Sequence, residues 1–125
     1  MMKITTVGLL LMVATMPVWA AYASVHSDDE ATTYVDLESM KSIGAIRRAW
    51  QITDLKKPDK SGNRSYRALV EFDCKERRAR ALQEDYFLGQ GNQGTRTGGM
   101  TSPGSWTYIA PLTVSDLVLT YVCTR

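Results

Sequence analysis

The sequence predicts a single small domain built around antiparallel β-strands, and its last segment carries signals for both a strand and a helix. Three observations support this prediction. Residues 45–54 and 65–74 alternate apolar and polar side chains, which is the period of a half-buried strand. The chain begins with the pattern of an export signal. Its only two cysteines, Cys74 and Cys123, lie at the ends of apolar stretches.

Residues 1–20 have the three-part layout of a secretory signal peptide. Met1-Met2-Lys3 is a short basic start, residues 4–18 are uncharged and mostly apolar, and Val18-Trp19-Ala20 offers a small-x-Ala cleavage site. We expect a signal peptide at 1–20 and a mature domain at 21–125, with cleavage after Ala23 as the alternative. A transmembrane anchor is the other interpretation, but the run is shorter than the ~20 residues that span a bilayer. No later run is longer, so no membrane span is expected in the mature chain.

Composition limits the classes of function. A mature chain of about 105 residues has the size of one domain. Loss of Lys3 with the signal would take the net charge from +2 to +1, and this near-neutral balance does not support nucleic-acid binding. We therefore expect no nucleic-acid partner.

The two cysteines favour a disulfide bond, because an exported protein reaches an oxidising compartment. A bond between Cys74 and Cys123 would close a loop of about 50 residues and stabilise the fold by roughly 3–4 kcal/mol. Two separate buried thiols are the alternative.

The first half of the mature chain predicts a hairpin and a long strand. Two β-prone runs, 21–26 and 32–36, flank an acidic turn, and a polar connection at 37–42 leads to a tight turn at 42–44. In the strand at 45–54, Ile46, Trp50 and Ile52 share the face that we expect to point into the core. Residues 56–63 form a polar loop with proline and glycine.

The second half begins with the clearest strand of the sequence, residues 65–74, which places Cys74 on its apolar face. A turn at 75–77 leads to a returning strand at 78–88. Residues 89–104 are rich in glycine and predict a long mobile loop or a loose hairpin, and a short strand at 105–109 carries Trp106. Trp50 and Trp106 are both expected in the core.

The last segment is ambiguous on local signals. Thr113 and Asp116 form a helix N-terminal capping box, and Leu119 and Cys123 then share one helical face. Residues 118–122 are nevertheless β-prone.

The sequence predicts no catalytic, cofactor or metal site. Residues 89–94 match the letters of a dinucleotide-binding fingerprint, but no helix can start after them as that chemistry requires. His26 is the only histidine, so neither a zinc site nor a Ser-His or Cys-His pair can be assembled around it.

The densest basic cluster lies at residues 75–80. Arg77, Arg78 and Arg80 are candidate partner-binding residues for an acidic surface. The alternative is structural, because arginines on this hairpin could pair with Glu71, Asp73 or Glu84 across the strands. Arg48 and Arg80 fall on faces expected to be apolar, which indicates that they are partly buried and paired.

An ordered set of residues spans nearly the whole mature chain. It comprises Tyr34-Val35-Asp36, Trp50, Lys57-Pro58, Ser65-Tyr66, Val70 to Cys74, Arg77 to Arg80, Tyr86-Phe87, a glycine-rich loop, Trp106, Ile109, Pro111 and Val122-Cys123. This set resembles the surface-adhesin protein E family of exported proteobacterial proteins.

The resemblance implies an α+β domain, with an antiparallel sheet of about six strands and a C-terminal helix packed on one face. It also implies that Cys74 and Cys123 are paired, so that the bond would join the helix to the sheet. It thus favours the helical interpretation of the last segment.

The resemblance implies a non-enzymatic binding module, because the family takes its name from adhesins that contact host matrix and serum proteins. The implied partner is a host matrix or envelope protein, and an open sheet edge would also allow a homodimer. The alternative is a periplasmic inhibitor or envelope accessory protein. No cysteine lies near the cleavage site to carry a lipid, so we expect a periplasmic or secreted, cell-surface location.

Overall fold

The computed structural model describes residue 8 and residues 22–125, so the expected signal peptide at 1–20 lies, apart from Gly8, outside the described residues. The elements are β1 (Tyr22–Ser27), β2 (Ala31–Asp36), β3 (Lys41–Ile43), β4 (Ile46–Leu55), β5 (Ser65–Asp73), β6 (Arg78–Phe87), the 3₁₀ turn η2 (Gln90–Asn92), β7 (Arg96–Met100), β8 (Thr107–Tyr108) and α1 (Val114–Cys123).

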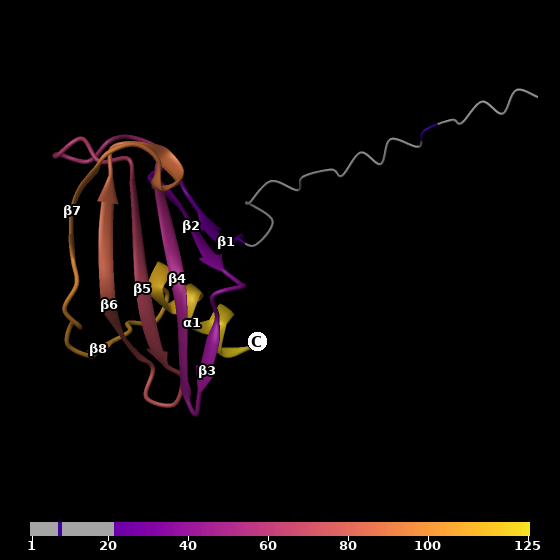
Figure 1. The fold of residues 1–125 in the computed structure, drawn as a ribbon. Helices are drawn as coiled ribbons and strands as arrows, with labels where there is room; N and C mark the ends of the chain where they lie inside the picture. The colour runs from indigo at the N-terminus through magenta and orange to yellow at the C-terminus, as the bar shows by residue number, and fades with distance from the viewer. Residues whose placement is uncertain (1–7, 9–21) are drawn as a thin grey trace, which may run out of the picture.

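Within residues 22–125, eight strands form one antiparallel sheet, and six of them follow the main order β1-β2-β4-β5-β6-β7. β2 and β3 pair with different halves of β4 and share its outer edge. β7 and β8 share the outer edge of β6 in the same way. Figure 1 shows the sheet with α1 behind it. The predicted α+β class, a sheet with a C-terminal helix on one face and one disulfide, is confirmed.

Two short strands lie outside the strands that the sequence predicted, although a loose hairpin was one of the two interpretations of residues 89–104. Residues 37–42 were expected to be a connection, but a turn after Asp36 leads into β3. The Oγ of Ser39 accepts a hydrogen bond from the backbone N–H of Trp50 at 3.0 Å. This backbone N–H lies at the point of β4 between the parts that pair with β2 and β3, so the side chain of Ser39 supplies the acceptor there. Residues 89–104 contain η2 and β7. Glycine is needed in β7 because a Cβ at Gly99 would clash with the carbonyl oxygen of Glu84.

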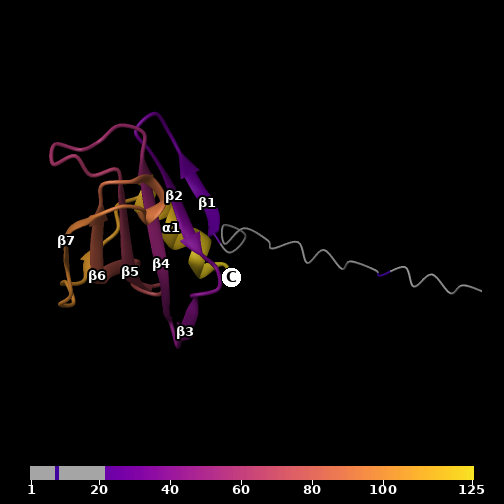
Figure 2. The ribbon, with the colours of Figure 1, turned by 45° about the horizontal axis from the view of Figure 1, so that its top comes forward.

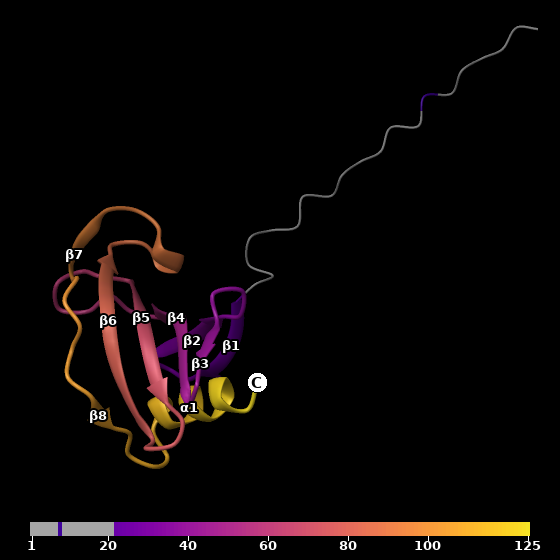
Figure 3. The same ribbon diagram turned by 60° about the horizontal axis from the view of Figure 1, so that its bottom comes forward.

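The core lies between the sheet and α1. The sheet supplies Val35, Ala49 and Phe72, all at most 2% exposed. The helix supplies Val118, Leu119 and Val122, which are at most 1% exposed. Figure 3 shows α1 on one face of the sheet and η2 on the other. We call these the covered face and the open face.

The predicted orientation of β4 is wrong. Ala49 belongs to the core cluster, and because side chains alternate along a strand, Trp50 points to the open face. The reason is that β4 carries apolar residues on both faces, so periodicity identifies the strand without identifying its inner side.

The helix begins as the capping box predicts. The Thr113 Oγ1 accepts the backbone N–H of Asp116 at 3.1 Å. Cys123 in its last turn forms a disulfide with Cys74, which follows β5, and the bonded residues have a Cα–Cα distance of 5.7 Å. The bond therefore fastens the end of the chain to the turn that follows β5, a central strand of the sheet. No helix in the described residues is long and apolar enough to span a membrane.

Candidate functional site

The open face carries rows of side chains that lie directly across from one another on β4, β5 and β6. The register places Arg48, Glu71 and Arg80 in one row. A second row contains Trp50, Leu69 and Gln83, and a third contains Ile52, Arg67 and Asp85. Charged and aromatic groups thus occupy the centre of a sheet face that α1 leaves free.

Glu71 is the centre of the first row. Its side chain is 7% exposed, and its two carboxylate oxygens accept hydrogen bonds from Arg48 at 3.0 Å and from Arg80 at 2.9 Å. Burial acts to raise the pKa of Glu71, but the hydrogen bonds from the two guanidinium groups outweigh it and lower the pKa below its ordinary value. Glu71 is therefore ionised and holds two arginines in place.

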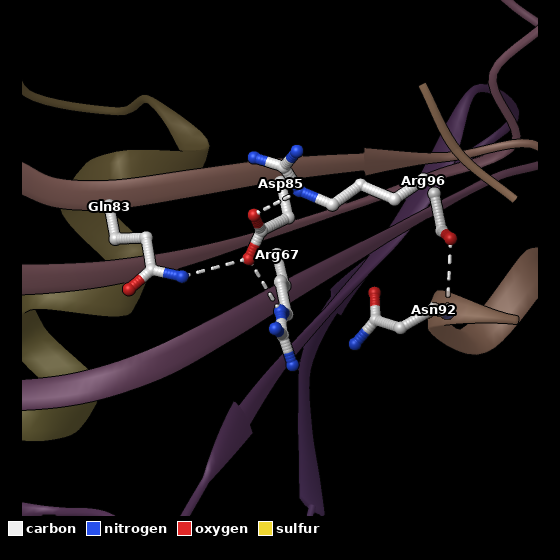
Figure 4. Close-up of polar contacts among 6 residues, drawn as sticks. Arg67, Gln83, Asp85, Asn92 and Arg96 are labelled. Carbon is white, nitrogen blue, oxygen red and sulfur yellow. Dashed lines mark hydrogen bonds and ion pairs between the residues drawn. The ribbon is translucent and has the colours of Figure 1, made fainter. Parts of the chain in front are cut away.

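Asp85 is the corresponding centre near β7 (Figure 4). Its side chain is 3% exposed and accepts hydrogen bonds from the Nε atoms of Arg67 at 2.8 Å and Arg96 at 2.7 Å. The amide of Gln83 donates a third bond at 3.1 Å. Burial acts to raise the pKa of Asp85, whereas these three hydrogen bonds lower it more, and the net shift is downward.

Trp106 contacts two arginine side chains at the other end of this face. The guanidinium carbons of Arg78 and Arg80 lie 4.9 Å and 4.7 Å from its ring centroid, which is the geometry of a cation–π contact. Arg78 also donates to Asp73 at 3.0 Å. Trp50 is held similarly, with the Arg67 guanidinium carbon 5.0 Å from its ring centroid. The prediction that Trp50 and Trp106 are core residues is wrong, since both are only partly buried and lie against arginines.

The three arginines predicted as one candidate site are divided by the structure. Arg78 and Arg80 lie on the open face beside Trp106. Arg77 instead pairs with Asp116 in the first turn of α1. The structural pairing proposed for this hairpin is thus present, with Asp73 and Glu71 as the carboxylate partners of Arg78 and Arg80.

The pairs are asymmetric in exposure. In the described chain, the five open-face arginines (Arg48, Arg67, Arg78, Arg80 and Arg96) have side chains 33–48% exposed. The three carboxylates that they share are 3–9% exposed. Each guanidinium has five N–H donors, so donors remain for a ligand after the internal bonds are made. The face can therefore present positive, planar donors to a partner that carries carboxylate or other anionic groups.

A pocket of about 300 Å³ opens where η2 crosses the open face. Tyr22, Tyr34 and Ile52 form apolar walls, and Arg67 and Asn92 add polar groups. The turn is held in place because Gly91 N–H donates to the Asp54 carboxylate at 2.6 Å and Asn92 N–H donates to the Ser65 Oγ at 3.0 Å. This pocket gives the face a recess in which one side chain of a partner can bind.

Sequence reasoning missed Arg67, Asp85 and Arg96 as site residues. The alternation of residues 65–74 already placed Arg67, Glu71 and Asp73 together on one face. The signal for Asp85 was weaker, because a register shift between Leu69 and Val70 changes which β6 residue lies opposite. Arg96 had no signal, since it comes from a stretch interpreted as a mobile loop or a loose hairpin with no defined register.

The described residues thus define a small disulfide-linked domain whose sheet has one face covered by a helix and one free face of arginines and aromatic rings. The sequence model of the family described as surface-adhesin protein E matches residues 19–124. The chain belongs to the surface-adhesin protein E family, and its class is that of adhesin-like surface proteins.

Solved structures of protein E from Haemophilus influenzae have a similar fold. Crystal form II is 17% identical with a TM-score of 0.66, and the match covers 86% of this chain and 91% of that one. A selenomethionine form is 17% identical with a TM-score of 0.65, covering 87% and 90%. A structure from a non-typeable strain is 16% identical with a TM-score of 0.60, covering 86% and 78%. A search of curated proteins found no match.

Proposed function

We propose that this protein is an exported, non-enzymatic binding module of adhesin type, which holds an acidic region of a host matrix or envelope protein against its open face. One observation carries the proposal. Arginines anchored on buried carboxylates surround two partly exposed tryptophans on a sheet face that, within the described chain, only η2 partly covers. Arginine and tryptophan are the side chains that most often dominate protein interfaces.

The anchoring itself favours binding. A guanidinium that is already fixed by a carboxylate and an aromatic ring loses little conformational entropy when a partner approaches. Arg80 has both supports, since it bonds Glu71 and stacks on Trp106. The positive surface would also speed association with an acidic partner at low salt.

The test compares binding of the mature protein to a panel of immobilised matrix proteins at several salt concentrations. The double variant Arg78→Gln, Arg80→Gln should keep its fold, because Glu71 retains Arg48 and Asp73 retains its backbone N–H donors. We expect binding at least about fivefold weaker, with a shallower dependence on ionic strength.

The matched control is Lys57→Gln, Lys60→Gln, which removes the same charge from exposed positions in the loop between β4 and β5. Equal affinity and equal salt dependence of the arginine variant and the control would contradict the proposal. Protease treatment of intact cells is the complementary test of location. Removal of the protein supports a surface adhesin, whereas survival with release by osmotic shock would favour the alternative role of a periplasmic inhibitor or accessory protein.

A further inference from the structure

A larger pocket lies on the covered face, where α1 does not reach. Its volume is about 680 Å³, and Tyr66, Tyr86, Asp59 and Glu84 are the lining residues with distinctive chemistry. An adjoining hollow of about 440 Å³ shares Glu84 with it and extends toward the start of α1. Together they form an elongated groove rather than a closed cavity. Figure 2 shows the loop between β4 and β5, which supplies Asp59, extending beyond the end of the sheet.

Two tyrosines in contact with each other each bond one carboxylate in this groove. The Tyr66 hydroxyl donates to Asp59 at 2.7 Å, and the Tyr86 hydroxyl donates to Glu84 at 2.9 Å. The two rings meet edge to face, with centroids 5.3 Å apart and planes at 83°. The carboxylates are therefore held next to aromatic rings.

The Asp59 side is rigidly organised. The side-chain N–H of buried Asn63 donates to the Asp59 carboxylate at 3.2 Å, and the hydroxyl of Thr97 in β7 donates to the side-chain oxygen of Asn63. The hydrogen bond from Tyr66 lowers the pKa of Asp59, so the carboxylate is charged at neutral pH. Desolvation and the bond to Asp59 raise the pKa of Tyr66 to about 12, so the phenol stays neutral.

Among the described residues that line the groove, the two cationic side chains bond carboxylates elsewhere. Arg67 lines the larger pocket and Arg80 lines the adjoining hollow, but their guanidinium groups bond Asp85 and Glu71 on the open face. The other residues lining the 680 Å³ pocket are uncharged apart from Asp59 and Glu84. The groove is thus negative and aromatic, the opposite of the open face.

We propose that this groove binds an arginine or lysine side chain from an extended segment of a partner protein. A carboxylate beside an aromatic ring is the arrangement that attracts a guanidinium or ammonium group, through charge and through the ring quadrupole. The elongated shape suits a peptide, because the adjoining hollow can take residues that flank the basic side chain. The site lies on the opposite face from the arginines, so it stands whether or not the open face binds an acidic partner.

The test is an amide-resolved NMR titration of the mature protein with a blocked pentapeptide, Gly-Ser-Arg-Ser-Gly. A second peptide with citrulline in place of arginine has the same shape without the charge. We expect the arginine peptide to shift amides around Tyr66, Tyr86 and Thr97, and the citrulline peptide to bind at least about fivefold more weakly.

Protein variants locate the effect. Glu84→Gln should weaken binding severalfold while its amide oxygen still accepts the Tyr86 hydroxyl, whereas Glu38→Gln removes the same charge from an exposed site and should change nothing. Tyr86→Phe keeps the ring and should retain binding, and Tyr86→Ala should lose it. Equal shifts from both peptides, shifts at other amides, or no effect of Glu84→Gln would overturn the proposal. So would binding of spermidine at these amides without binding of the arginine peptide.

Discussion

The two faces of the sheet are stabilised by different interactions. The covered face is apolar where α1 lies, and its side chains are almost completely excluded from water. The open face has no second layer apart from η2, and it fills its centre with arginines bonded to buried carboxylates. The first kind of contact is non-directional and scales with buried area, whereas the second depends on geometry and on pH.

The difference teaches how a thin domain can keep one face free for binding. An exposed apolar sheet face would invite aggregation. Arginine side chains cover the strands with their methylene groups while the charged ends stay in water, and buried acids fix their positions. The open face is therefore both a structural layer and an accessible surface. The following predictions separate these two roles.

The largest effect should come from the disulfide that holds α1 to the covered face. Replacing both Cys74 and Cys123 with alanine should lower the free energy of unfolding by roughly 3–4 kcal/mol, because the unfolded chain regains the entropy of an open loop. Chemical denaturation measures the loss. Hydrogen exchange should show that protection falls most strongly in α1. Uniform loss over both faces would contradict the assignment of the bond to the covered side.

Matched leucine substitutions on the two faces should have unequal effects. Leu119→Ala removes a side chain that is 1% exposed in the core, and we expect a loss of about 3 kcal/mol. Leu69→Ala on the open face removes a partly exposed side chain, and we expect about 1 kcal/mol. Urea denaturation of both variants gives the comparison. Equal losses would show that the open face is as tightly packed as the core.

Asp85→Asn should make the open face less stable in a way that depends on pH. The folded pKa of Asp85 lies below its ordinary value, so its stabilisation is fully present above the unfolded pKa and is lost as pH falls through the folded pKa. At pH 7 we expect the variant to be about 1–2 kcal/mol less stable.

The gap in unfolding free energy between wild type and Asp85→Asn should then begin to shrink as the pH falls below about 4, where Asp85 of the unfolded chain becomes protonated, and should be lost as the pH falls through the lower folded pKa. Equilibrium denaturation from pH 7 to pH 2 tests this. A gap that stays constant over the whole range would mean that Asp85 contributes through shape and hydrogen bonding rather than through its charge.

The smallest effect should come from Arg77→Gln, which removes an exposed pair with Asp116 on the helix side. We expect a change in unfolding free energy below about 1 kcal/mol. The backbone φ of this residue is 52°, a conformation in which Arg and Gln have the same steric cost. The substitution therefore leaves the stability of the turn itself unchanged. Binding of an acidic partner should match wild type, in contrast to the Arg78 and Arg80 variant. A loss of binding as large as theirs would extend the site around the turn.

Sequence reasoning predicted most strands and the helix cap, because these depend on local patterns. Alternation located β4 and β5, the turn at 75–77 indicated β6 as the returning strand, and Thr113 with Asp116 marked the start of α1. It failed for β3, and for the region of β7 it left open a loop or a loose hairpin. The polar residues of β3 and the glycine-rich residues of β7 adopt a strand because a neighbouring strand offers hydrogen bonds. Sequence reasoning also assigned the wrong face of β4 to the core. Trp50 and Trp106 were misplaced for a related reason, since large rings can be buried by arginines as well as by a core.

The candidate site was predicted in part. Arg78 and Arg80 were identified from a cluster in the sequence, and the same cluster wrongly joined Arg77 to them. Arg96 could not have been found, because it reaches Asp85 only after β7 pairs with β6.

The sequence by itself determined the strand period, the helix cap and the two cysteines available for one bond, since each depends on residue types at short spacing or on their number. Only the tertiary structure decided which face of each strand meets α1 and which arginine meets which acid. Those choices depend on strand register, in which a shift of one residue turns every side chain to the other side, and register is fixed by long-range packing.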